Sequence, residues 1–205
     1  MSDPPPPGEV VPAGYGELLE QVKTEVRSAR VRATRAATTE LIDVYWQVGR
    51  LILDRQQAEG WGTKVIERLA GDLRAAFPGM RGLSQRNLVY MRSFAAAFPG
   101  ETITQRCVAQ LPWGHITVLL DRVEGATDRA WYAAAAVEHG WTRDVLTHQI
   151  TSRLHTRVGA APSNCTATLP STDSDLAQAV VRDPYLLDFL DLSPSRSPNA
   201  TSRPR

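Results

Sequence analysis

The sequence predicts an all-α fold, a bundle of about six helices with a helix-turn-helix-like segment and a disordered C-terminal tail. Apolar residues recur at spacings of three and four along most of the chain, which is typical of amphipathic helices. Glycines, prolines and capping residues separate these stretches at intervals of one helix length. No stretch shows sustained alternation of apolar and polar residues, so a β-sheet is not expected.

The first and longest helix is expected from Glu17 to about Ala58, a stretch without proline. A helix of this length spans roughly 60 Å, more than one small core can cover. It therefore either breaks near Ala37–Thr39 or packs its first half against a partner chain. The residues of its expected apolar stripe are Leu18, Val22, Val26, Ala29, Ala33, Ala37, Leu41, Val44, Val48 and Leu51.

Shorter helices follow, and each is bounded by residues that start or stop helices. Pro112 stands at one helix start, and Gly140 closes another helix. The expected N-caps are Thr63, Ser84, Thr127 and Thr142. Together with the helix that starts at Pro112, these caps introduce apolar faces in residues 65–77, 88–98, 116–120, 131–137 and 145–154.

Composition divides the chain into five parts. Residues 1–14, rich in proline, are expected to form a disordered arm, and residues 15–157 the helical domain. Residues 158–175 have the composition of a linker, residues 176–192 form a short apolar island, and residues 193–205 are expected to be a disordered tail. Because few contacts should cross the linker, removing it and everything after it is expected to change thermal stability little.

Net charge, targeting signals and cysteine content indicate what kind of protein this is and where it is located. The net charge is +1, well short of the bias of a dedicated nucleic-acid binder. The sequence shows neither a signal peptide nor an apolar run long enough to cross a bilayer, so a cytoplasmic location without membrane contact is expected. Cys107 and Cys165 are then expected to be two reduced thiols.

Seven segments in order resemble the N-terminal domain of the YhcG-like family of bacterial proteins, a domain of unknown function. Each segment is short, and the specificity lies in the ordered set, which extends over roughly residues 15–192. The segments are YWQVGR at 45–50, GWG at 60–62, PGMRGLSQRNL at 78–88, QLPWGH at 110–115, WY at 131–132, WTR at 141–143 and DPYLLDFL at 183–190.

The resemblance implies a nuclease domain of the PD-(D/E)XK type after the last segment, with an Asp and a Glu-x-Lys that hold a divalent metal. Here the chain ends 13 residues after Leu192, and neither Lys23 nor Lys64 is preceded by Glu-x. Residues 176–192 would then be the remnant of the join to that domain. We therefore expect a chain truncated before the nuclease, with no catalytic residue, no metal site and no cofactor.

The two helices on either side of residues 77–83 resemble a helix-turn-helix variant, with residues 84–98 as the recognition helix. Arg suits guanine, Asn and Gln suit adenine, and Ser and Tyr reach phosphates. The alternative is an ordinary capped helix with a polar outer face, since the connector is longer than usual. The candidate DNA-binding residues are Ser84, Gln85, Arg86, Asn87, Tyr90 and Arg92.

Two arginines of the first helix, Arg27 and Arg30, are further candidates for phosphate contacts, and a solvated surface is the alternative. The five tryptophans are expected in the core rather than stacked on bases. His148 and His155 lie two helical turns apart, too far for one metal ion, and His115 is expected to be a hydrogen-bonding residue at the core edge.

These observations favour a non-catalytic DNA-recognition module. The alternative is a protein–protein interaction or dimerisation scaffold that uses the long first helix, either as a homodimer or with a partner protein. The two functions differ in salt dependence, because phosphate contacts weaken steeply with ionic strength and an apolar helix interface does not.

Overall fold

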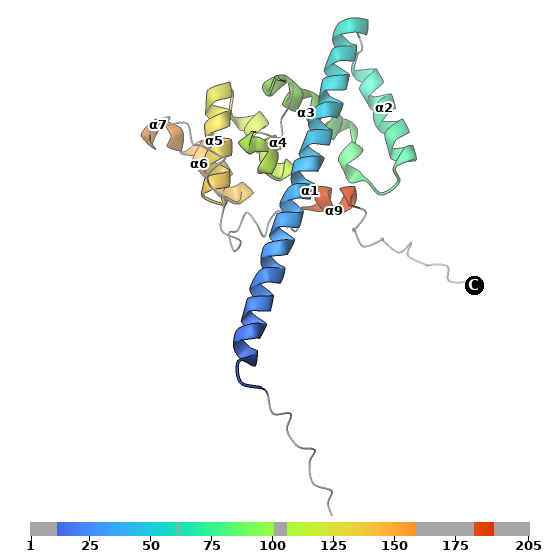
Figure 1. Ribbon diagram of the computed structural model, residues 1–205. Helices are drawn as coiled ribbons and strands as arrows, with labels where there is room; N and C mark the ends of the chain where they lie inside the picture. Colours follow the sequence, from blue (N-terminus) through green and yellow to red (C-terminus); the bar gives the residue numbers. More distant parts are fainter. Residues whose placement is uncertain (1–11, 61, 101–105, 159–182, 191–205) are drawn as a thin grey trace, which may run out of the picture.

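The computed structural model describes residues 12–60, 62–100, 106–158 and 183–190. Within these ranges every regular element is a helix, which confirms the all-α fold (Figure 1). The elements are α1 (Tyr15–Glu59), α2 (Thr63–Ala76), η1 (Arg81–Leu83), α3 (Gln85–Ala97), η2 (Cys107–Gln110), α4 (Trp113–Arg122), α5 (Ala126–Glu138), α6 (Arg143–Thr151), α7 (Leu154–Val158) and α9 (Pro184–Phe189).

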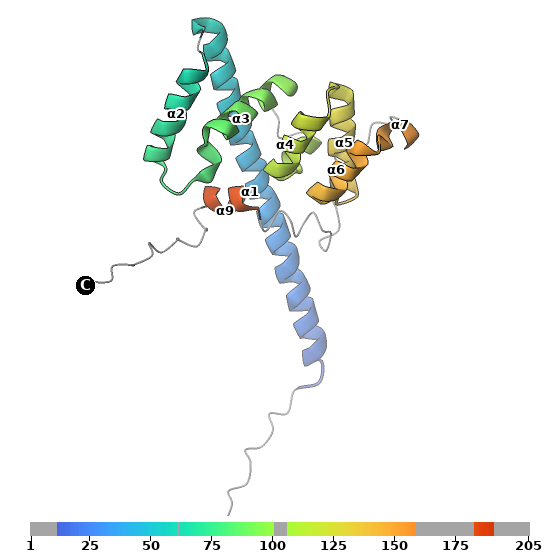
Figure 2. The same ribbon diagram turned by 180° about the vertical axis from the view of Figure 1, so that it is seen from behind.

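Helix α1 runs without a break near Ala37–Thr39. Its C-terminal half lies among the other helices, and its N-terminal half projects away from them (Figures 1 and 2). Of the expected apolar stripe only Leu41 is buried, because a second face of α1 with larger side chains faces the core. The buried residues of α1 are Thr38, Leu41, Ile42, Tyr45, Trp46, Gly49 and Ile52.

The closest approach in the core is the crossing of α1 with α3. A Cβ atom on Gly49 would lie 2.0 Å from the carbonyl oxygen of Met91, so only glycine fits there. Beside the crossing, the indole N–H of Trp46 donates to the carbonyl of Phe98 at 3.0 Å. The guanidinium of Arg50 lies 5.5 Å from the Trp46 ring centroid and donates to the carbonyl of Gly100.

Trp113 lies at the centre of the core and is fully buried. Its ring meets Tyr45 and Phe94 edge to face, at centroid distances of 4.8 and 5.8 Å. The core placement expected for the tryptophans is confirmed for Trp46 and Trp113, while Trp131 and Trp141 are partly buried against the same core. The fifth, Trp61, is outside the described residues.

The helix starts follow the sequence in part. Ser84 and Thr142 are N-caps, as predicted. Thr127 lies inside α5, whose N-cap is Gly125, and α2 begins at Thr63 after Gly62. The last expected helix is divided into α6 and α7 at Arg153, which has a φ of 52°.

The apolar island at residues 176–192 was expected to be separate from the helical domain, but its helix α9 packs against that domain. Its Leu186 is buried in the core, and Tyr185 and Phe189 pack against it. Residues beyond the linker therefore pack against the domain, and we now expect their removal to lower its stability. Most of the expected arm, linker and tail lies outside the described residues.

Two further findings concern the cysteines and the search for membrane-spanning helices. Cys107 is disulfide-bonded, so the expectation of two reduced thiols is wrong, because spacing along the sequence does not report distance in space. Cys165 lies outside the described residues. Among the residues with described positions, no helix is both long and apolar enough to cross a membrane.

Candidate functional site

An open cavity of about 410 Å³ lies where the N-terminal ends of α3, α4, α6 and α9 meet. It is lined by three arginines from three different elements, Arg81, Arg86 and Arg143. Aromatic side chains and two carboxylates complete the wall. These residues are Tyr90, Trp113, Tyr185, Asp121 and Asp188.

The start of α3 sets the position of the first wall. The hydroxyl of Ser84 accepts the backbone N–H of Asn87 at 3.3 Å, which satisfies one of the free donors at the helix start. One turn along, the guanidinium of Arg86 lies 5.6 Å from the Tyr90 ring centroid. The Tyr90 hydroxyl in turn donates to the Asp121 carboxylate at 2.9 Å. This row of contacts joins the exposed face of α3 to α4.

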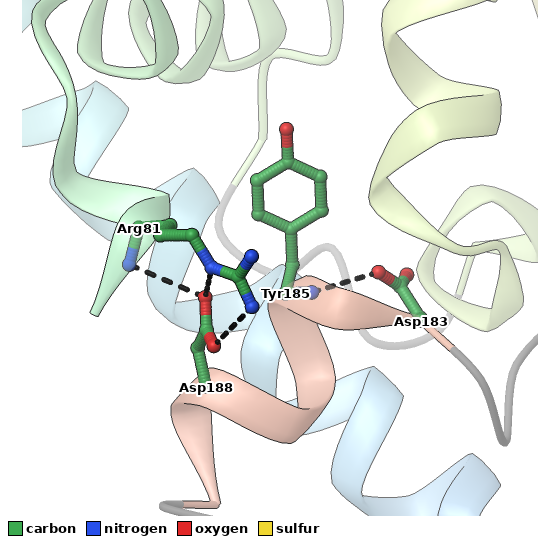
Figure 3. Close-up of polar contacts among 4 residues, drawn as sticks. All are labelled: Arg81, Asp183, Tyr185 and Asp188. Atoms are coloured by element: carbon green, nitrogen blue, oxygen red, sulfur yellow. Dashed lines mark hydrogen bonds and ion pairs between the residues drawn. The ribbon is translucent and has the colours of Figure 1, made fainter. Parts of the chain in front are cut away.

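The opposite wall is held by an ion pair between η1 and α9 (Figure 3). The guanidinium of Arg81 makes two parallel bonds to the Asp188 carboxylate, Nε to Oδ2 at 2.9 Å and Nη2 to Oδ1 at 3.1 Å. The carboxylate is almost completely buried, whereas the side chain of Arg81 is 68% exposed. The bonds to Asp188 raise the pKa of Arg81, so its charge is secure.

Asp183 fixes the start of α9 by accepting the backbone N–H of Tyr185 at 3.0 Å (Figure 3). Burial raises the pKa of Asp183, and backbone N–H groups of Tyr185, Trp113 and Leu186 oppose that rise. The carboxylate therefore links the first turns of α9 and α4. With the start of α9 fixed, the ring of Tyr185 stands out from the helix toward the cavity (Figure 3).

The structure brings only part of the predicted DNA-binding set together. Ser84, Arg86 and Tyr90 line the cavity. Gln85 lies in an adjoining hollow of about 570 Å³ between α3 and α4, which it shares with Arg86 and Tyr90. The outer face of α3 thus borders α4.

Two residues of that set do not belong to the outer face. Asn87 borders the cavity but is only 6% exposed, and its amide oxygen faces the Trp113 indole N–H at 3.5 Å, so its expected outward position is wrong. Arg92 turns toward α1 and donates to Gln56 at 3.4 Å. Both follow from the helical period, which places positions 87 and 92 off the face of 86 and 90.

Arg27 and Arg30 are exposed on the projecting half of α1. With a rise of 1.5 Å per residue, they lie roughly 30 Å along the axis from the crossing at Gly49. The structure therefore does not bring them to the cavity.

The cavity residues that were not among the predicted candidates include two arginines and a tyrosine: Arg81, Arg143 and Tyr185. Each belongs to one of the segments on which the family resemblance rests, at 78–88, 141–143 and 183–190. The segment at 110–115 contributes Trp113 and Gly114 to the same cavity. Segments far apart in the sequence thus converge on one place, a signal that was present in the sequence but could be located only by the fold.

The histidine at the edge of this site has a structural role. His115 is 2% exposed, and its Nε2–H donates to the carbonyl of Trp141 at 3.0 Å, as expected for a core-edge residue. Burial and, to a lesser extent, Arg143 lower its pKa, so the neutral ring is favoured. Within the part of the chain that the structure describes, no three His, Cys, Asp or Glu side chains gather as metal ligands would.

Comparison with known proteins agrees with the resemblance. The model of the DUF1016 N-terminal domain matches residues 21–157. A protein of Escherichia coli strain K12 with the name "Putative nuclease YhcG" is 26% identical over an alignment of 216 residues, gaps included, that covers 88% of this chain and 57% of the relative. The chain thus spans little more than half the length of that relative. No solved structure matches.

Proposed function

The chain belongs to the family of the DUF1016 N-terminal domain, and from this premise we propose that it is a non-catalytic DNA-recognition module. The similar protein of Escherichia coli is named a nuclease, and a nuclease acts on nucleic acid. Cleavage is not proposed for this chain, because neither of its two lysines stands in a Glu-x-Lys triplet. A DNA-binding role implies a location in the cytoplasm, where bacterial DNA lies, and the disulfide at Cys107, uncommon in that compartment, is the observation that opposes this location.

The observation that carries the proposal is the group of three arginines around one open cavity at the start of α3. Arginine presents a planar fork of donors that matches phosphate and guanine, and it is the usual choice for nucleic-acid recognition. Asp188 already occupies the fork of Arg81 in part, so Arg86 and Arg143 are the proposed DNA contacts. In this proposal α2, η1 and α3 act as a helix-turn-helix variant.

Two further features support this use of the cavity. The Tyr185 and Tyr90 rings line it beside the arginines, and aromatic rings stack on unpaired bases. The acids Asp121 and Asp188 stand among the arginines, which limits the positive field and fits the nearly neutral net charge. Recognition would therefore depend on specific contacts more than on a broad basic surface.

The test is a titration of labelled duplex and four-way-junction DNA with the protein, followed by fluorescence anisotropy at several salt concentrations. Replacement of Arg86 by alanine should weaken binding to the preferred DNA by roughly tenfold or more. The wild-type affinity should fall with salt, with a log–log slope of about −0.9 for each phosphate contacted.

Arg55→Ala is the matched control, because Arg55 is a strongly exposed arginine near the end of α1, outside the cavity and outside the proposed helix-turn-helix, and it pairs with Glu59. It removes the same charge and should leave affinity almost unchanged. Equal losses of DNA affinity in the two variants would show that the effect comes from the change in net charge and not from a specific contact. Absence of binding to either DNA at low salt would reject the proposal.

A second candidate function, a protein-interaction scaffold, is favoured by one observation. The projecting half of α1 exposes Leu18, Val22 and Val26 by about half of their surface. Association through these residues should be nearly indifferent to salt, in contrast to DNA binding. Measurement of both equilibria over the same salt range therefore separates the two functions.

A further inference from the structure

The projecting half of α1 has the sequence pattern of a helix that packs against a second helix. Apolar residues recur there at alternating spacings of four and three, which is the heptad pattern of a coiled coil. The residues of this seam are Tyr15, Leu19, Val22, Val26, Ala29 and Ala33. We propose that this seam joins two copies of the chain as a parallel, two-stranded coiled coil. The inference deepens the second candidate function and does not depend on DNA binding.

The exposure of the seam supports pairing. Tyr15, Val22 and Val26 are 49, 50 and 48% exposed, on a helix whose other half is built into the core. A contiguous row of exposed large apolar residues is unusual on a protein surface unless another surface covers it. Leu18, at 57% exposed, flanks the seam and widens the apolar strip.

The charges beside the seam select the second copy as partner and fix its direction. In the heptad that places Val22 at position d, Glu25 is at g and Arg30 is at the following e position. In a parallel pair these positions face each other across the interface, so Glu25 of each copy meets Arg30 of the other, twice in each dimer.

The antiparallel alternative is disfavoured by the same residues. With Tyr15 opposite Ala33, so that the d residues of one copy meet the a residues of the other, Glu25 would lie near Glu25 of the second copy and Lys23 near Lys23. Both contacts bring like charges together, which opposes pairing. Within one chain Glu25 pairs with Arg32 at 3.0 Å, but both side chains are strongly exposed, so that bond contributes little and can be exchanged.

The geometry of α1 leaves room for the helical bodies of both copies at the same end of a parallel coiled coil. The core-facing residues of α1, from Thr38 to Ile52, lie roughly a third of the circumference away from the seam. The projecting half extends beyond the other helices, with the helical body at its C-terminal end (Figures 1 and 2). In a parallel pair the two bodies would therefore face outward on either side of the axis.

Sedimentation of the full chain without DNA tests the pairing. Wild type should be a dimer at micromolar concentration. Val26→Glu with Ala33→Glu places two charges at the seam and should weaken the dimer by about 100-fold or more. The matched control is Gln21→Glu with Thr24→Glu, which adds the same charge to the outer face of a neighbouring turn and should remain dimeric. A wild-type monomer at high concentration would overturn the proposal.

Direction is tested by cross-linking and by charge reversal. Val22→Cys should form a disulfide between two copies only if the pair is parallel, because an antiparallel pair places Val22 opposite Val26. Gln21→Cys, which lies on the outer face, and the wild type serve as controls for non-specific disulfide formation between copies. Glu25→Arg should weaken the dimer, and addition of Arg30→Glu should restore it. Cross-linking that occurs only when Val22→Cys is mixed with Val26→Cys would show antiparallel pairing and overturn the inference.

These outcomes are separate from the fate of the DNA proposal. The dimer is measured without DNA, and DNA binding is tested by Arg86→Ala outside the seam. A dimer that does not bind DNA rejects the first proposal alone, and a monomer that binds DNA rejects the coiled coil alone. Circular dichroism of each seam variant should retain the helical signal, because every replaced side chain is exposed.

Discussion

The two halves of α1 are one uninterrupted helix with opposite fates. In the C-terminal half, Ile42 and Tyr45 are fully buried and Gly49 touches the backbone of α3. In the N-terminal half, Val22 and Val26 are about half exposed. Both halves show apolar residues at helical spacing, so periodicity alone indicates a helix in each but not what the helix packs against.

Side-chain size distinguishes the halves. The buried face of the C-terminal half contains isoleucine, tyrosine and tryptophan, which remove large areas from water, whereas the exposed stripe is valine and alanine apart from its first turns. A glycine at the crossing lets the backbones of α1 and α3 come close, and no such contact exists near Gly16. A core thus forms around the larger side chains, and the smaller ones remain available for a second chain.

The largest effect is expected from alanine at the two glycines of α1. Gly49→Ala should destabilise the domain by about 3 kcal/mol or more, because its Cβ would lie 2.0 Å from the Met91 carbonyl oxygen and backbone cannot easily move away. Gly16→Ala meets no atom within 4 Å and should raise helix stability by up to about 1 kcal/mol. Urea unfolding followed by tryptophan fluorescence measures both, and similar values for the two would show that the crossing is looser than described.

Helix α9 extends the comparison to a segment that is distant in sequence. Leu186 is 2% exposed, whereas Leu190, one turn further on, is 41% exposed. Leu186→Ala should cost about 2–4 kcal/mol, and Leu190→Ala less than about 1 kcal/mol. Thermal unfolding of both variants checks the difference. If Leu186→Ala lowered the stability only slightly, α9 would not contribute to the core.

Acid should affect the body and not the projecting half. Because burial lowers the pKa of His115, the folded state favours the neutral ring and the unfolded state takes up the proton more readily. This contribution is complete above the ordinary histidine pKa of 6.5 and is lost as the pH falls below it, by up to about 1.4 kcal/mol per pH unit. His115→Gln should flatten that fall between pH 6.5 and 5. An unchanged profile would assign the acid sensitivity to other groups.

The sequence was sufficient for the helical class, most helix boundaries and the family, because these depend on local periodicity, caps and ordered motifs. It was insufficient for the packing. Asn87 was expected to face outward, but it faces Trp113, since the orientation of α3 depends on where α1 and α4 lie. Arg81, Arg143 and Tyr185 could be read in the motifs, yet their meeting in one cavity depends on contacts between segments that are far apart in the chain.

The smallest expected effect is the sharpest test of the contrast within α1. Here the substitution that removes fewer atoms should cost more stability than the one that removes more atoms. Ile42→Val removes a single methylene from a fully buried side chain and should cost about 0.5–1.5 kcal/mol. Val26→Ala removes two methyl groups, but from a half-exposed side chain, and should change the stability of the monomer by less than about 0.5 kcal/mol. Both are measured at a protein concentration below that at which dimers form, with the fluorescence of Trp46 and Trp113 as the probe of the body. A larger loss for Val26→Ala under these conditions would mean that the projecting half is stabilised within one chain, and the surface offered to a second copy would then be already covered.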